Sequence, residues 1–126
     1  MSGVLEDLRK VRTLVSERWA QNSCAVNAKG LVTGVYEPDA ERFCALGAMY
    51  LIGGTEGNSR TPRVMEMAEV VAVECQMQSS RDDYLNTIIV TNDNGGQEMI
   101  LRAIDATIGK LEAPAPVAPE KEELFV

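Results

Sequence analysis

The chain has 126 residues, of which 45% are hydrophobic and 25% are charged, and its formal net charge is −7. This length suits one domain with one hydrophobic core, and the composition is that of a soluble globular protein, not of a disordered or fibrous one. The acidic charge repels a phosphate backbone, so direct binding of DNA or RNA is not expected.

Histidine is absent, which removes the commonest metal ligand and the usual general base. Cys24, Cys44 and Cys75 lie far apart and form neither a disulfide framework nor a metal knuckle. We therefore predict no metal site, no cofactor and no catalytic residue. The odd number of cysteines indicates a reducing compartment, and the sequence shows neither a signal peptide nor a long apolar run. A cytoplasmic protein with no membrane partner is expected.

Apolar residues recur every three or four positions from Val4 to Trp19, which predicts a first amphipathic helix with Trp19 as a core anchor. Residues 22–38 break this period with glycines, asparagines and a proline, so we expect a loop with a small β-hairpin at about 24–36. A hairpin of this size is marginal alone and has to pack on the helices.

The second helix is predicted at residues 40–53, with Asp39 as its N-cap. Apolar side chains lie all round it, so it should be central and buried, and Gly47 would let a neighbouring helix approach closely. Thr61 and Pro62 then predict the cap and first residue of a third helix that reaches about Gln78. Its buried stripe is expected to comprise Val64, Met65, Ala68, Val71, Ala72 and Cys75.

Residues 84–91 carry conflicting signals, because acidic residues before them favour a helix start while their β-branched side chains favour a strand. We favour a short helix there. Residues 94–97 match a capping box and predict a last helix that ends near Glu112. The fold class is therefore mainly α, a compact bundle of four to five helices over residues 1–112.

Residues 113–126 change composition sharply, with alternating prolines followed by an acidic and then apolar tip. The prolines favour an extended spacer outside the core, so we expect a disordered tail. Such a tail can present a short peptide to another protein, and the alternative is an end that folds onto its own body. The predicted docking residues are Glu122, Glu123, Leu124, Phe125 and Val126.

Two further segments invite a chemical interpretation. Cys44 stands near a helix start, where a thiol can become reactive, but its apolar flanks and the lack of histidine favour a structural cysteine. Residues 92–96 carry side-chain oxygens at short spacing, yet the twelve-residue calcium loop is missing, so a tight turn and the cap of the final helix explain them better.

Trp19 with Gln21, Cys44 with Gly47 and Asn92 with Asp93 form three short motifs. Together they resemble a family of small uncharacterised proteins found in bacteriophages and bacteria. That family often has W-x-Q-G, then C-x-x-G-A, then W-N-D before a final helix, and the resemblance spans residues 5–111. Thr91 stands where the family has its second tryptophan. The resemblance implies a compact helical domain, it makes a phage origin more plausible, and it implies no activity. The matching residues, expected to be structural, are Trp19, Gln21, Cys44, Gly47, Asn92 and Asp93.

The sequence therefore favours a non-enzymatic protein that binds a host or phage protein through its helical body or its tail, for example as an inhibitor of a host nucleic-acid-handling system. A virion component or other structural subunit is one alternative. A small enzyme that uses Cys44 or Asp93 without histidine is the other.

Overall fold

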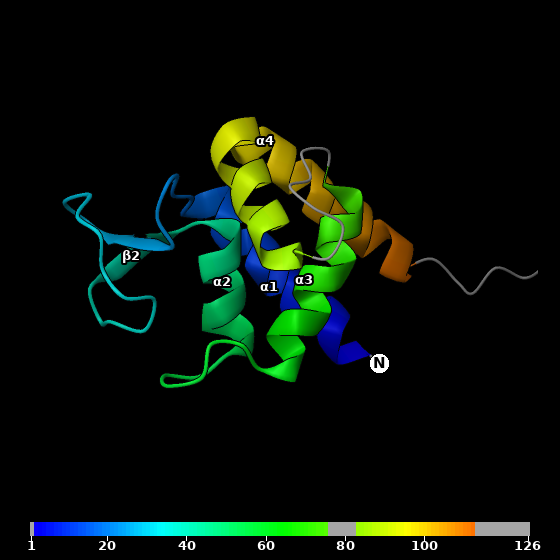
Figure 1. Ribbon diagram of the computed structural model, residues 1–126, viewed down its shortest axis with the longest axis horizontal. Helices are drawn as coiled ribbons and strands as arrows, with labels where there is room; N and C mark the ends of the chain where they lie inside the picture. Colours follow the sequence, from blue (N-terminus) through cyan, green and yellow to red (C-terminus); the bar gives the residue numbers. More distant parts are fainter. Residues whose placement is uncertain (1, 76–82, 113–126) are drawn as a thin grey trace, which may run out of the picture.

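The computed structural model describes residues 2–75 and 83–112 (Figure 1). These residues form a mainly α fold with a small antiparallel sheet, as the sequence predicts. The elements in chain order are α1 (Ser2–Glu17), β1 (Ala25–Asn27), β2 (Ala40–Phe43), α2 (Ala45–Gly53), α3 (Pro62–Glu74) and α4 (Tyr84–Glu112).

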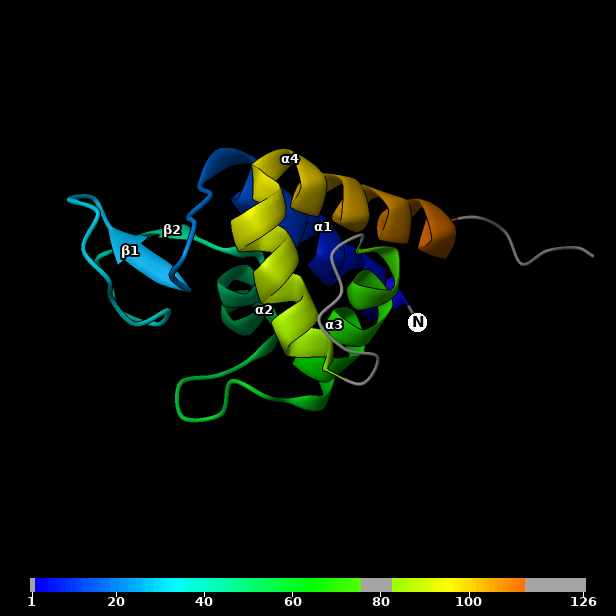
Figure 2. The same cartoon turned by 45° about the horizontal axis from the view of Figure 1, so that its top comes forward.

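All four of these helices contribute to one hydrophobic core. The apolar stripe of α1 is completely buried at Leu8, Val11 and Val15, as its three- and four-residue spacing requires. Leu46 and Met49 of α2 are among the largest fully buried side chains, so the predicted central position of this segment is confirmed. Figures 1 and 2 show the helices grouped together, with the strands standing off to one side.

The predicted helix at residues 40–53 is wrong in its first turn, because residues 40–43 form strand β2. Their backbone pairs with β1, in a register that places Ala25 opposite Phe43. On its other side Phe43 donates to the carbonyl of Arg18 at 2.7 Å and accepts from the amide of Ala20 at 2.9 Å. Backbone partners on both sides hold this segment extended, so α2 begins at Ala45 and Asp39 is not its cap.

The turn of the hairpin predicted at 24–36 is confirmed, but its two predicted strands pair only in part. The side-chain oxygen of Asn27 accepts from the amides of Lys29 and Leu31 at 2.9 and 3.0 Å, and Val26 forms an antiparallel bridge with Val32. The longer ladder of β1, however, is with the more distant β2. We call residues 25–43 the arm, because both views show this segment projecting from the helices (Figures 1 and 2).

Helix α3 begins as predicted, since the Thr61 hydroxyl accepts from the amide of Val64 at 3.2 Å. It ends at Glu74, earlier than predicted, because Cys75 is extended and caps the helix. The predicted stripe is correct except at Met65, which is 36% exposed, while Met67 is fully buried.

The two helices predicted after residue 83 are both present, as the two helical parts of α4, which meet at a kink at Gly96 (φ 84°, ψ 175°). Residues 84–91 are helical and do not form a strand. Within the turn predicted at residues 92–96, residues 92–94 are helical, and the chain leaves the helical conformation only at Gly96. The predicted capping residue Gln97 instead donates from Nε2 to the carbonyls of Val15 and Ser16, at 2.9 and 3.2 Å, and so caps the end of α1. None of the described helices combines the length and apolar character needed to cross a bilayer.

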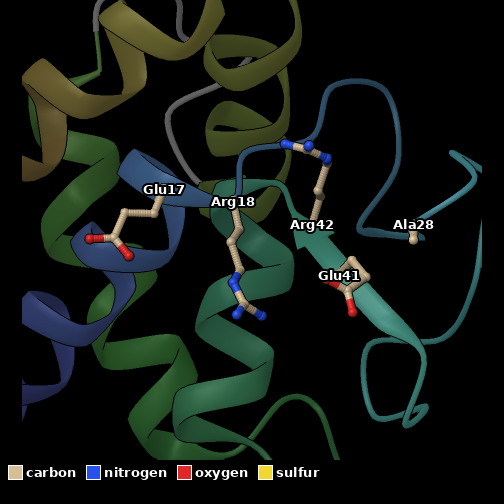
Figure 3. Close-up of a pocket in the computed structure, with 5 residues that line it drawn as sticks. All are labelled: Glu17, Arg18, Ala28, Glu41 and Arg42. Atoms are coloured by element: carbon tan, nitrogen blue, oxygen red, sulfur yellow. The ribbon is translucent and has the colours of Figure 1, made fainter.

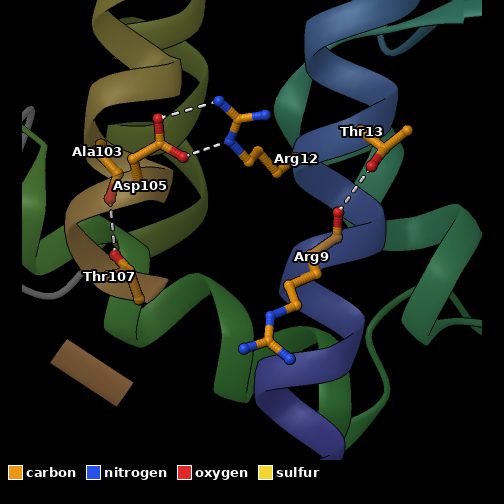
Figure 4. A network of polar contacts seen from close by, with 6 residues as sticks. All are labelled: Arg9, Arg12, Thr13, Ala103, Asp105 and Thr107. Carbon is orange, nitrogen blue, oxygen red and sulfur yellow. Dashed lines mark hydrogen bonds and ion pairs between the residues drawn. The ribbon is translucent and has the colours of Figure 1, made fainter. Parts of the chain in front are cut away.

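Two ion pairs join α1 and α4, and Figure 4 shows the one between Arg12 and Asp105. Arg12 contacts Asp105 through two nitrogens, with distances of 2.5 Å from Nε to Oδ1 and 3.4 Å from Nη2 to Oδ2. Arg9, three residues before Arg12 in α1, pairs at 2.5 Å with Glu112, seven residues after Asp105 in α4. These side chains are about half exposed, so each pair adds at most about 1 kcal/mol and helps to fix how the two helices align.

Candidate functional site

The motif residues come together in space at one junction, where the end of α1, the start of α2 and the middle of α4 meet. Asn92 is its centre, with no exposed surface. Its Oδ1 accepts from Nε1 of Trp19 at 2.8 Å and from the amide of Ala45 at 3.0 Å. Its Nδ2 donates to the carbonyl of Ala20 at 3.1 Å and to Oδ1 of Asp93 at 2.8 Å. An asparagine side chain has two donors and two acceptor positions, so Asn92 is fully satisfied.

Asp93 and Gln21 continue this network at the surface. Oδ1 of Asp93 also accepts from the amide of Asn22 at 2.8 Å, and Nε2 of Gln21 donates to the carbonyl of Asp93 at 2.6 Å. Asn22 has a positive φ of 69°, an unusual conformation for a residue other than glycine. The Asp93 carboxylate thus holds the chain at the point where it turns from α1 towards the arm.

Cys44 and Gly47 form the third part of the junction. Sγ of Cys44 accepts from the amide of Gly47 at 3.2 Å and caps α2, and Cys44 is 4% exposed. A Cβ at Gly47 would lie 2.0 Å from the carbonyl oxygen of Cys24. Gly47 is therefore needed for close packing, as predicted, but its neighbour is the segment before β1 and not another helix.

Cys24 also belongs to this junction, although no sequence motif indicates it. It is partly exposed, and its thiol is hydrogen-bonded to the buried thiol of Cys44. That hydrogen bond lowers the pKa of Cys24 to about 7, against the opposing effects of burial and of the Asp93 charge. The same bond, together with burial, raises the pKa of Cys44. The pairing depends on the β1–β2 register, which the sequence pattern did not reveal.

The described residues contain no group of three or more acidic or cysteine side chains that could hold a metal ion. A depression of about 280 Å³ lies between the end of α1 and the arm, and it is lined by Glu17, Arg18, Ala28, Glu41 and Arg42 (Figure 3). The two arginine side chains point in opposite directions, and two carboxylates share the surface. This arrangement does not converge on one ligand.

A family model matches residues 1–110 of the chain, and its description is a family of unknown function, DUF6197. The chain belongs to DUF6197. The predicted membership of an uncharacterised family is thereby confirmed, and the matched range includes every residue of the junction around Asn92. No curated protein and no solved structure matches this DUF6197 chain. The predicted docking peptide, Glu122 to Val126, lies outside both the matched range and the residues that the structure describes.

Proposed function

We propose that this DUF6197 protein acts by binding another protein, and that the arm is its docking surface. The observation that carries the proposal is the exposure of Leu31 and Val32, which are 61% and 74% exposed on the projecting arm. Burying an aliphatic side chain of this size contributes roughly 2 kcal/mol. In the free protein these two adjacent side chains remain exposed to water. A partner with a complementary apolar pocket would bury them, and this burial would stabilise the complex.

The charges of the arm indicate the chemistry of that partner. Glu37, Asp39 and Glu41 are exposed acidic residues, against the two exposed basic residues Lys29 and Arg42. The whole chain carries a net charge of −7. A protein whose apolar pocket is rimmed by basic side chains would complement this surface and associate faster at low salt.

The junction around Asn92 supports a binding function over a catalytic one. Its polar groups, those of Asp93 included, hydrogen-bond to backbone atoms and to one another. Cys44 serves as a helix cap and is buried. These contacts hold three segments of the chain together. Such an arrangement is typical of a structural motif that supports a surface elsewhere in the molecule.

The test compares binding by full-length protein and three altered forms. The double variant Leu31→Asp with Val32→Asp alters the arm, Val73→Asp alters an equally exposed apolar residue on α3, and removal of residues 113–126 tests the tail. Partners captured from bacterial and phage-infected lysates are identified by mass spectrometry, and their affinities are then measured with purified proteins.

We expect one partner to lose at least tenfold in affinity with the arm variant, which corresponds to about 1.4 kcal/mol or more. The Val73 variant and the shortened chain should bind it as the wild type does. Binding that depends on Val73 or on the tail, and not on Leu31 and Val32, would contradict the proposal. The identity of the partner separates an inhibitor of a host nucleic-acid-handling system from a virion component.

A further inference from the structure

Cys24 and Cys44 lie opposite each other at the base of the arm. Cys24 directly precedes β1 and Cys44 directly follows β2, and the next pair along the ladder, Ala25 with Phe43, is in register. The amide of Cys44 donates to the carbonyl of Cys24 at 3.2 Å, so the backbone pairing extends to the two cysteines. Opposed residues of this kind have Cα atoms about 5.5 Å apart, within the range of roughly 4.4–6.8 Å that a disulfide requires.

The two thiols are also suited to different roles. Cys24 is a partly exposed residue, and its sulfur accepts a hydrogen bond from the buried thiol of Cys44. Because the pKa of Cys24 is lowered to about 7, a large part of it is thiolate at neutral pH, and the thiolate is the reactive form. Cys44 keeps its proton, since burial and the same hydrogen bond raise its pKa.

We propose that Cys24 and Cys44 form a peroxide-sensitive dithiol site, in which Cys24 is the thiol that is oxidised first and Cys44 the thiol that resolves it to a disulfide. The oxidant is a small hydroperoxide such as hydrogen peroxide. This site is independent of the arm's proposed binding partner.

The chemistry balances with these groups alone. The Cys24 thiolate attacks one peroxide oxygen and breaks the O–O bond, which leaves Cys24 as a sulfenic acid and releases hydroxide. The hydroxide takes up, through the solvent, the proton that the Cys24 thiol lost on ionising and becomes water. The Cys44 sulfur then attacks the Cys24 sulfur, the S–O bond breaks, and the hydroxyl group leaves as water with the Cys44 proton. Two thiols are oxidised to one disulfide, and one hydrogen peroxide is reduced to two water molecules.

Cys75 offers a matched comparison inside the same chain. It caps α3 and is 5% exposed, and burial raises its pKa. A buried thiol of raised pKa reacts slowly with peroxide. Cys75 should therefore remain reduced while the junction pair oxidises.

The experiment treats native full-length protein with equimolar hydrogen peroxide, blocks remaining thiols with iodoacetamide and maps the tryptic peptides by mass spectrometry. Cleavage after lysine and arginine places the three cysteines in separate peptides, residues 19–29, 43–60 and 64–81. We expect peptides 19–29 and 43–60 to be joined within one monomer, with a mass lower by two hydrogen atoms and with separation on adding dithiothreitol. Peptide 64–81 should carry the blocking group.

Single serine variants separate the two steps. Cys24→Ser should remove rapid oxidation, Cys44→Ser should stop at a sulfenic acid that dimedone traps, and Cys75→Ser should behave as the wild type. The rate should fall as the pH is lowered below the Cys24 pKa of about 7. A sulfenic acid in the wild type without the cross-link, a link through Cys75, or a link between two chains would overturn the proposal, and so would a Cys24 thiol no faster than that of an unfolded peptide.

Discussion

At the scale of single residues, Asn92 explains why the chain can bring three distant segments together. It is completely buried, and it bonds to Trp19, Ala20 and Ala45 from the end of α1 and the start of α2. A buried polar group is tolerated only when its hydrogen bonds are made, and each partner depends on Asn92 in return.

Asn92→Ala should therefore lower the free energy of unfolding by about 3 kcal/mol or more, because it leaves the indole N–H of Trp19, the amide of Ala45 and the carbonyl of Ala20 without this partner. Urea unfolding followed by Trp19 fluorescence measures the change. The matched control is Asn94→Ala, an exposed asparagine of the same helix, which should change stability by less than about 0.5 kcal/mol. Equal effects of the two substitutions would show that the junction does not depend on Asn92.

The sequence predicts most of the residues of this junction but not how they are arranged in space. The residues that match the family motifs are Trp19, Gln21, Cys44, Gly47, Asn92 and Asp93. The sequence predicts a turn at Asn92 and Asp93, because asparagine and aspartate are common in turns. The tertiary contacts of Asn92 outweigh that local preference and keep these residues in α4. Cys24 carries no local signal, since its partner is 20 positions away along the chain.

At the scale of the elements, the bend in α4 lets one element serve two packing surfaces. Before Gly96 the helix supplies Asn92 to the junction, and after it Ile100 and Ile104 enter the core and Asp105 pairs with α1. The backbone at Gly96, with φ 84° and ψ 175°, lies in a region that is essentially restricted to glycine.

Gly96→Ala should destabilise the protein by roughly 1–3 kcal/mol, through backbone strain alone, because a Cβ there meets no atom within 4 Å. Gly109 is the matched control. It lies inside the same helix with no positive φ and equally open space, so Gly109→Ala should stabilise by about 0.5–1 kcal/mol. Thermal unfolding by circular dichroism measures both, and a Gly96→Ala variant stabilised as much as the Gly109→Ala variant would show that the bend does not need glycine.

The arm shows where element prediction fails for a physical reason. Residues 40–43 have a sequence compatible with a helix, yet their backbone groups are paired with β1 and with residues 18–20. Such pairing joins segments well separated in the chain, and no window of local sequence contains it. The amphipathic stripes of α1 and α3 were predicted well, since a helix makes its own backbone bonds.

At the scale of the whole molecule, the core is built around α2. Leu46 is 2% exposed and belongs to the cluster that residues of all four helices share. Among the described residues, the three most exposed large apolar side chains are Val32 and Leu31 on the arm and Val73 on α3.

Leu46→Asp should destabilise the fold by roughly 4 kcal/mol or more, because it removes apolar burial and places an unpaired charge in the core. Val73→Asp, on the exposed face of α3, should leave the unfolding temperature nearly unchanged. Circular dichroism melts of the two variants make the comparison. An unaltered melting temperature for the Leu46 variant would contradict the central position of α2.

The sequence by itself determined the mainly α class, the positions of α1 and α3 and the family resemblance, because apolar periodicity, helix caps and motif residues are local features. The tertiary structure alone decided that residues 40–43 form a strand, that Asn92 bonds to three segments at once and that Cys24 faces Cys44. Each of these depends on a hydrogen bond between residues far apart along the chain. Such a bond forms only after the helices have packed and brought its two partners within reach.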